Sequence, residues 1–298
     1  MKAPDLKIPA GLLPAAFLVA AGSALPALVC HLLRITLPVW LIWTQTVILA
    51  AALIASLRDP RLTPFKPLAA AVLAAHIFTV WGNRLTLIPV WRSVFSGADQ
   101  LAGFQEAIAL KLIGAFLLAI VLTAGLGSSG QALLKPGELY RRARGIGWLG
   151  IKDREIKWLR LALVSGLCIA GGTALLSILT VTGFRPLQNV QLRVSALPLL
   201  IPLAAANAFA EGILYRNTIA APLAGRIDDR LTAILAGFYF GAAHYAGIPG
   251  GLAGAAASGL LGWFMTRAML ETRGFLAAWI IHAMQDLVIF SLVMLLRR

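Results

Sequence analysis

Residues 207–216, NAFAEGILYR, place two charged side chains, Glu211 and Arg216, inside an apolar run from about Ala196 to Leu223. A charge near the centre of a membrane helix costs roughly 2.5–3.5 kcal/mol on insertion scales, so a carboxylate there needs partners or a water-filled cavity. Later apolar runs carry three more titratable side chains, namely His244, His282 and Asp286. Packing alone explains Glu211 and these three groups poorly, and together they predict a polar site buried among apolar helices.

The composition is that of an integral membrane protein. Hydrophobic residues make up 59% of the 298 positions and charged residues only 13%, whereas soluble domains average about 25% charged. The apolar runs are about twenty residues long and lack the strict alternation of barrel strands. We therefore predict an all-α, polytopic membrane protein whose site lies in a membrane-embedded cavity.

The net charge of +14 does not indicate a nucleic-acid-binding protein. The Lys and Arg residues lie between the apolar runs, as they do in loops on the cytoplasmic side of a membrane, where they meet anionic lipid. No basic stripe is interleaved with aromatic residues on a soluble module. We expect membrane lipids as partners and no nucleic acid.

Nine apolar runs can be counted along the chain. Basic residues near both termini favour placing both ends inside, which requires an even number of crossings, so we predict about eight. The short run Leu68–Trp81 is then re-entrant or interfacial. The first run is too long for a signal peptide and is interpreted as an uncleaved helix. The runs cover Ile8–Cys30, Pro38–Ser56, Leu68–Trp81, Ala102–Leu126, Trp158–Thr182, Ala196–Leu223, Leu231–Ala246, Leu252–Met269 and Phe275–Leu296.

The longest polar stretch, Gly127–Lys157, divides the chain. It is rich in Lys and Arg and is therefore predicted to be cytoplasmic. Its segment Arg141–Arg144 has the chemistry to contact phospholipid headgroups, but we interpret it as a topology determinant. The predicted organisation is N-terminal transmembrane helices over residues 1–126, the basic cytoplasmic loop over 127–157, and a C-terminal helical core over 158–298.

Other polar residues in the apolar runs are interpreted structurally. Glu106 and Lys111 are near enough in sequence to pair, or to extend toward one end of their helix. His76 is expected to be a packing residue. The two cysteines, Cys30 and Cys168, show no metal-type spacing and are expected to be small buried hydrophobic residues.

Helical spacing groups the titratable residues further. Residues four apart share a face of an α-helix, so Phe240 lies beside His244, and His282 beside Asp286. Glu211 and Arg216 are five apart, about 140° round an α-helix, and should not share a face. Arg216 is then suited to holding a carboxylate or a backbone carbonyl.

Three short segments resemble motifs of a known family. They are EGILYR at 211–216, FGAAH at 240–244 and HAMQD at 282–286. In this order they resemble the motifs of the CPBP intramembrane proteases, which include the type II CAAX prenyl endopeptidases and bacterial Abi-type proteins. The family pattern is Glu-Glu-x-x-x-Arg, Phe-x-x-x-His and His-x-x-x-Asn/Asp. The resemblance covers roughly Pro198–Leu296. It implies a multi-pass endopeptidase, expected in a bacterial inner membrane, that cleaves a membrane-associated peptide or protein.

The resemblance also implies roles for single residues. Glu211 would be the general base and would activate water together with His244, because no serine or cysteine nucleophile accompanies them. His282 and Asp286 would stabilise the oxyanion. Arg216 and Phe240 would support the site, and no cofactor or metal would be needed.

The sequence departs from the pattern at one motif position and takes the less usual option at another. Gly212 stands where the second motif glutamate is expected. Its absence puts the reaction rate or the pKa of Glu211 in question, although Glu211 itself is present as a base. Asp286 can donate a hydrogen bond to an oxyanion only when it is protonated. Otherwise it orients His282.

Alternatives from other classes use the same residues. Glu211, His244, His282 and Asp286 form a credible nitrogen and oxygen ligand set for zinc, although no HExxH segment is present. Intramembrane acids and histidines also make proton relays, so a proton-coupled carrier is possible in chemical terms. No internal repeat pairs the two halves as carriers commonly do. A membrane immunity or binding protein without catalysis is the remaining alternative.

Overall fold

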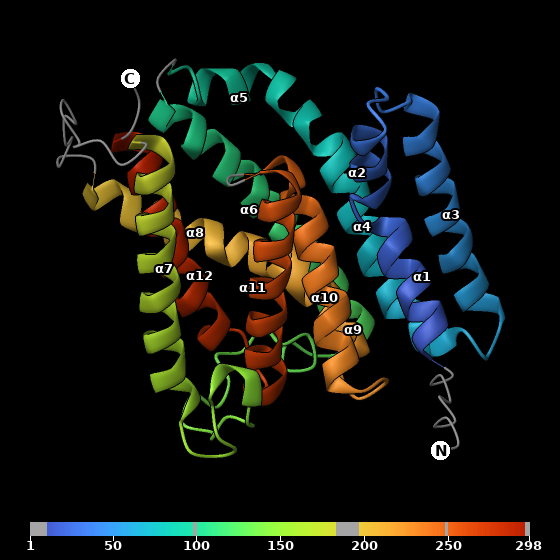
Figure 1. The fold of residues 1–298 in the computed structure, drawn as a ribbon. Coiled ribbons are helices and arrows are strands. Elements are labelled where there is room, and N and C mark those ends of the chain that lie inside the picture. Colours follow the sequence, from blue (N-terminus) through green and yellow to red (C-terminus); the bar gives the residue numbers. More distant parts are fainter. Residues whose placement is uncertain (1–10, 98–99, 183–196, 248–249, 296–298) are drawn as a thin grey trace. The chain divides into compact units, whose positions relative to one another are not determined.

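The computed structural model describes residues 11–97, 100–182, 197–247 and 250–295, and these ranges are mostly helical, with a long loop between α6 (Gln100–Leu126) and α7 (Trp158–Thr182) (Figure 1). They contain no β-strand, only three isolated bridges between single residue pairs. The prediction of an all-α protein is confirmed.

Six helical segments of the described ranges are long and apolar enough to cross a membrane, and a seventh is counted if a bent pair of helices forms one span. The chain is therefore a polytopic membrane protein. The number is below the eight expected. The runs Leu231–Ala246 and Leu252–Met269 form α10 (Asp229–Ala243) and α11 (Gly251–Thr272), which are not in this set. At 1.5 Å per residue, α10 is about 22 Å long and too short to span the hydrocarbon core.

The first apolar run is broken, so the prediction of one helix over Ile8–Cys30 is wrong. It forms α1 (Leu12–Gly22) and α2 (Leu25–Leu32), bent by 60°. At the break, Ser23 Oγ donates to the Ala20 carbonyl oxygen at 2.8 Å and accepts from the Leu25 amide at 3.1 Å. Pro26 in the first turn of α2 lacks the N–H that would continue α1.

The run expected to be re-entrant is long enough to cross. Leu68–Trp81 lies within a candidate span, Thr63–Leu87, made of η1 (Thr63–Phe65), α4 (Lys66–Trp81) and η2 (Gly82–Leu87). A broken or re-entrant span fits the α1–α2 pair instead, because among the described residues it is the pair bent by more than 40° at a short break.

The chain divides into two compact units, each assembled from segments that are distant in sequence. Unit 1 consists of Met1–Val80, Ile120–Ala132 and Tyr215–Thr266, and unit 2 of Trp81–Ala119, Leu133–Leu214 and Arg267–Arg298. Two long helices, α6 (Gln100–Leu126) and α11, contribute to both.

Unit 1 contains α1, α2, α3 (Val39–Arg58), η1, α4, α9 (Thr218–Leu223), α10 and η6 (His244–Ala246). Its core is a cluster of aliphatic side chains that includes Leu18, Leu49, Val72 and Ile219. Gly241 brings α10 close to α11, since a Cβ there would lie 2.5 Å from the Ala255 carbonyl oxygen. His76 is buried and shares a 3.1 Å hydrogen bond with Thr46 Oγ1, as its structural interpretation predicts.

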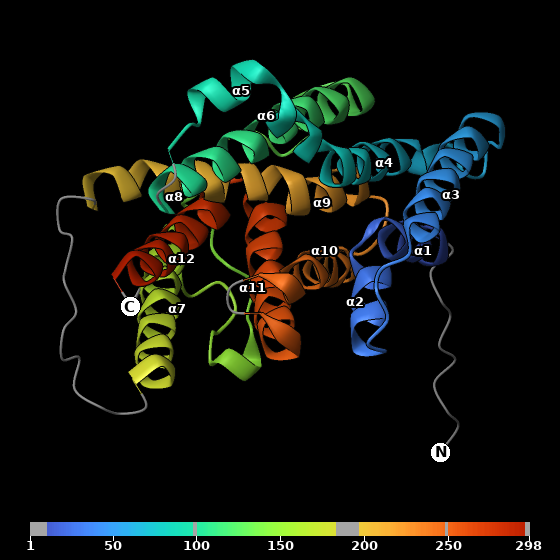
Figure 2. The ribbon, with the colours of Figure 1, turned by 90° about the horizontal axis from the view of Figure 1, so that it is seen from above.

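Unit 2 contains α5 (Pro89–Val94), η3 (Gly147–Leu149), α7 (Trp158–Thr182), α8 (Leu197–Glu211) and α12 (Leu276–Leu295). Helix α12 packs against both α7 and α8, and Figure 2 shows these three helices together. Phe104 on α6 stacks on Phe290 of α12 with 4.8 Å between ring centroids. Cys168 on α7 is exposed, contrary to the burial expected, because it lies on a helix with a largely uncovered outer face.

Candidate active site

Glu211 is the last residue of α8, where the backbone changes from α-helix to a π-helix, η5 (Gly212–Asn217), before continuing as α9. The α-helical angle expected between Glu211 and Arg216 is therefore wrong, because a π-helix has a wider, i→i+5 turn. Single π turns inside α-helices occur frequently at functional sites. Glu211 itself is 6% exposed.

Glu211 meets two basic groups in unit 2. Its Oε1 lies 2.6 Å from Lys111 Nζ, which comes from α6, and its Oε2 lies 3.5 Å from His282 Nε2 on α12. Lys111 also donates to Asn207 Oδ1 at 2.8 Å. A short bond between an ammonium and a carboxylate is charge-assisted and stronger than a neutral hydrogen bond. The cation supplies the partner that a carboxylate in an apolar run requires.

His282 and Asp286 share a face of α12, as their spacing predicts. His282 Nε2 lies 3.5 Å from Asp286 Oδ1, so the ring nitrogen lies between the carboxyl groups of Asp286 and Glu211. Asp286 Oδ2 accepts a 2.9 Å hydrogen bond from Asn207 Nδ2. His282, Asp286 and Asn207 are all buried.

Because a lysine ammonium can only donate hydrogen bonds, it determines how the side-chain amide of Asn207 is oriented in this network. Lys111 has no acceptor, so Asn207 must turn its oxygen toward Lys111 and its amide nitrogen toward Asp286. Asp286 Oδ2 then acts as an acceptor. Any proton that Asp286 carries lies on Oδ1, the oxygen that faces His282 Nε2.

Phe240 and His244 share a face at the end of α10 in unit 1. Their ring centroids are 4.1 Å apart, and His244 Nδ1 lies 2.8 Å from the carbonyl oxygen of Phe240. A carbonyl can only accept, so Nδ1 carries a proton and Nε2 is the acceptor nitrogen of the neutral ring. The guanidinium of Arg216, which is 1% exposed, lies over the ring of Phe240 at 5.5 Å.

The comparison with known protein families points to the same part of the chain. Residues 193–288 match the family described as type II CAAX prenyl endopeptidase Rce1-like. We refer to these residues, which are similar to that family, as the Rce1-like region. No curated protein and no solved structure matches the chain. The match covers all three motif segments, confirms the resemblance to the CPBP family and supports a CAAX-type intramembrane endopeptidase in general. Such a peptidase acts on a membrane-associated peptide or protein.

The structure groups the predicted site residues of the Rce1-like region within the two units. Glu211, His282 and Asp286 lie together in unit 2. Arg216, Phe240 and His244 lie together in unit 1.

Two residues of the unit 2 network were not assigned to the site from the sequence. Lys111 was expected to pair with Glu106 or to extend toward a helix end, but Glu106 instead accepts a 2.8 Å hydrogen bond from Trp91 Nε1. Lys111 and Asn207 belong to the Glu211 network. The signal available in the sequence was that an isolated lysine in an apolar run needs an anionic partner as much as Glu211 needs a cation.

The zinc alternative has less support from the positions of these residues. Across the four described ranges, no group of three or more His, Cys, Asp or Glu residues is placed to hold a metal ion. Lys111 lies against Glu211 Oε1 at 2.6 Å, where a metal bound to that oxygen would meet a second cation.

Proposed function

We propose that the protein is an intramembrane endopeptidase in which Glu211 and His244 activate water for direct attack on a peptide carbonyl. His282 and Asp286 stabilise the oxyanion that forms, and no metal takes part. The observation that carries the proposal is the buried network of Glu211 with Lys111, His282 and Asp286, placed inside the Rce1-like region.

The base in this proposal is Glu211. Lys111 stabilises the negative charge of its carboxylate, so the group is ionised and can accept a proton from water. As the water oxygen bonds to the carbonyl carbon, the proton passes to Glu211 and later to the nitrogen of the leaving amine when the C–N bond breaks. His244 supports the same water by accepting at Nε2, since its Nδ1 proton is held by the Phe240 carbonyl.

The oxyanion needs donors that are in place before the reaction. His282 supplies one at Nε2 when that nitrogen is protonated, and Asp286 supplies one at Oδ1 when that oxygen is protonated. Asn207 keeps Asp286 in one orientation through its bond to Oδ2. Arg216 and Phe240 pack against each other beside His244 and support its position.

The substrate class follows from the family match and the membrane spans. We propose a membrane-associated peptide or protein as substrate and a bacterial inner membrane as location, and a prenylated peptide with a CAAX end is the first substrate to assay.

The test is cleavage of such a peptide by purified protein in lipid vesicles. Glu211→Gln keeps the size and hydrogen bonding of the side chain but removes its basicity, and should lower the rate by about 10²–10⁴. Glu106→Gln is the matched control, because Glu106 is a glutamate of an apolar helix that bonds Trp91 rather than the Glu211 network. Cleavage by Glu211→Gln at the rate of the control variant would remove Glu211 as the base.

A further inference from the structure

The basic stretch Gly127–Lys157 is a folded element of unit 2 over its second half. Antiparallel bridges join Arg142 to Lys157 and Ile146 to Ile151. The Ala143 amide donates to the Ile156 carbonyl at 2.8 Å. Cations on this segment are therefore held on a defined backbone, unlike those of a topology signal, which needs only a count of charges.

A buried carboxylate, Glu271 at the end of α11, fixes this segment to the helices of unit 2. Its Oε2 accepts from the Arg144 amide at 2.8 Å and from Trp158 Nε1 at 3.0 Å. Its Oε1 accepts from Arg267 Nε at 2.6 Å, and Arg267 donates in turn to the carbonyls of Arg144 and Gly145. One glutamate, 6% exposed, thus anchors both the segment and the start of α7.

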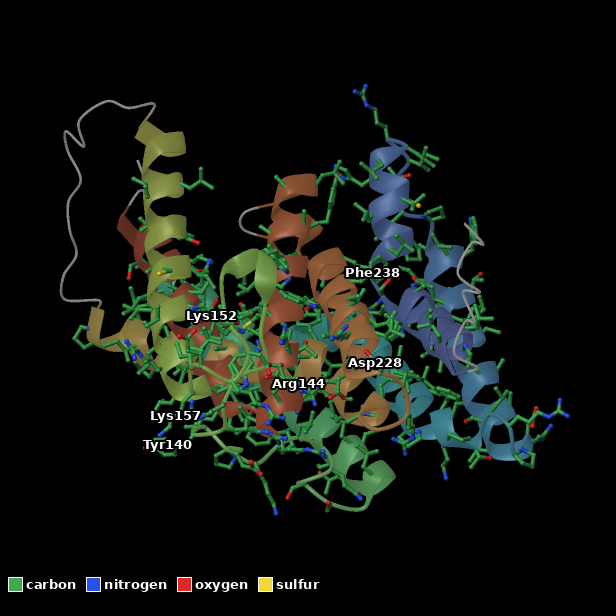
Figure 3. The ribbon with its side chains drawn as sticks, turned by 60° about the horizontal axis from the view of Figure 1, so that its bottom comes forward. Tyr140, Arg144, Lys152, Lys157, Asp228 and Phe238 are labelled. Atoms are coloured by element: carbon green, nitrogen blue, oxygen red, sulfur yellow. The ribbon has the colours of Figure 1, made fainter. Side chains whose placement is uncertain are left out.

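Beside this anchor lies a hollow of about 520 Å³ whose charged lining is strongly cationic. This volume is within the range of about 300–1,000 Å³ that holds small ligands. We name it the loop pocket. Its charged lining residues are Arg142, Lys152, Lys157, Arg160 and Glu155, four cations to one acid. Figure 3 labels Lys152 and Lys157 on this side of the molecule.

The four cations of the loop pocket outnumber its one acid, Glu155. Within the part of the chain that the structure describes, none of the four is paired with a carboxylate. Lys157 Nζ lies 5.6 Å above the ring of Tyr140, and Arg142 Nη1 donates to the Arg154 carbonyl at 2.9 Å. The four cations are exposed, so water screens much of their mutual repulsion, and an anionic ligand that contacted several of them would be attracted by all of them.

The loop pocket lies where a membrane surface would be. Lys157 directly precedes α7 and Arg160 lies in its first turn, where the candidate span Trp158–Leu176 begins. The same segment exposes apolar and aromatic side chains: Tyr140, Trp148 and Leu149 are 70%, 64% and 47% exposed. Aromatic residues and cations together are the usual anchors at the level of lipid headgroups.

We propose that the loop pocket binds the phosphate-bearing headgroup of an anionic phospholipid. The shared chemistry of the site is a phosphate ester anion, and the exposed Trp148 and Leu149 beside it favour a lipid over free phosphate. The site is distinct from the Glu211 network and does not depend on peptidase activity.

The experiment measures binding of a fluorescent phosphatidylglycerol to the full-length protein in neutral detergent micelles. Lys152→Gln combined with Arg160→Gln should weaken binding about tenfold or more, because each Lys or Arg at a membrane surface contributes substantially to anionic lipid attraction. Arg58→Gln combined with Arg61→Gln is the matched control, since it removes two exposed cations outside the pocket and changes the net charge equally. The control pair should bind as the unmodified protein does.

Three further variants separate recognition of the lipid from general effects on the protein. Lys152→Arg combined with Lys157→Arg should retain binding, and Glu155→Gln should strengthen it by removing the acid of the pocket. Glu211→Gln should bind normally, so loss of the peptidase and loss of the lipid site are distinguishable.

Three outcomes would overturn the proposal. The first is equal weakening by the control pair, and the second is equal binding of phosphatidylcholine. The third is complete displacement of the lipid by millimolar inorganic phosphate or glycerol phosphate, which would show a soluble anion as the ligand.

Discussion

Removing the ammonium group of Lys111 should destabilise the folded protein, because the buried carboxylate of Glu211 would then have no cation beside it at Oε1. Lys111→Met keeps a long apolar stem but leaves the Glu211 carboxylate without its 2.6 Å partner. Breaking a fully buried ion pair from one side costs about 3–5 kcal/mol, whereas exposed pairs contribute about 0.2–1 kcal/mol. The Glu211 side chain is 8% exposed and that of Lys111 35%.

The loss of unfolding free energy caused by Lys111→Met therefore lies between these two limits. We expect about 2–3 kcal/mol from the pair, discounted for the exposure of Lys111. Asn207 Oδ1 also loses the bond that Lys111 donates, which adds about 1 kcal/mol. The total is about 3–4 kcal/mol, so at about 2–4 °C per kcal/mol for a large domain the thermal midpoint should fall by about 6–16 °C.

The assay is thermal unfolding in detergent, followed by tryptophan fluorescence, as a double-mutant cycle. Glu211→Gln removes the buried charge, so adding Lys111→Met to it should cost much less, with a coupling energy of at least about 1.5 kcal/mol. Lys66→Met is the control, because Lys66 is an exposed lysine and its loss should change stability by no more than about 0.5 kcal/mol. Additive effects of the two site changes, or a midpoint for Lys111→Met equal to that of the control, would refute the reasoning.

Three further predictions concern metal, topology and Asp286. Protein treated with a strong chelator should keep its peptidase activity; stoichiometric zinc, lost with activity and restored with it, would establish the metal alternative on Glu211, His244, His282 and Asp286. If the stretch Gly127–Lys157 is cytoplasmic, Arg141→Cys should react only with reagents that enter the cell, and labelling from outside would reverse the orientation. Asp286→Asn must present its oxygen to Asn207 Nδ2 and its amide to His282, so it preserves a donor. Activity should survive with a flatter decline at high pH, and a large loss at every pH would show that Asp286 acts as an anion.

Local features of the fold and of the site could be predicted from the sequence. The apolar runs predicted most of the helices. The four-residue spacing placed His282 beside Asp286 on one helix, and Phe240 beside His244 where α10 continues directly into η6. The break at Ser23 and Pro26 also had a signal, since Pro26 cannot continue the preceding helix. That signal was outweighed by the length of the apolar run.

Long-range partners could not be assigned in the same way. Lys111 and Glu211 are 100 residues apart, and two glutamates of apolar runs, Glu106 and Glu211, were available to the lysine. The choice depends on Trp91, which supplies a donor to Glu106 and leaves Lys111 for Glu211. The π-helix at 212–217 had no signal, because such turns are rare and follow no simple sequence pattern.

The glycine at position 212 can be understood from the charges around it. Glu211 and Asp286 bring at most two negative charges to the network, and Lys111 and His282 at most two positive ones, so the cluster can be electrically neutral with all four groups ionised. With a neutral His282, one proton on Asp286 restores the balance. A second motif glutamate would add a third carboxylate next to Glu211 in sequence at a buried position, and an uncompensated charge is costly among buried groups. Lys111 therefore makes one glutamate sufficient for a balanced site, and we expect Gly212 to be compatible with a working general base.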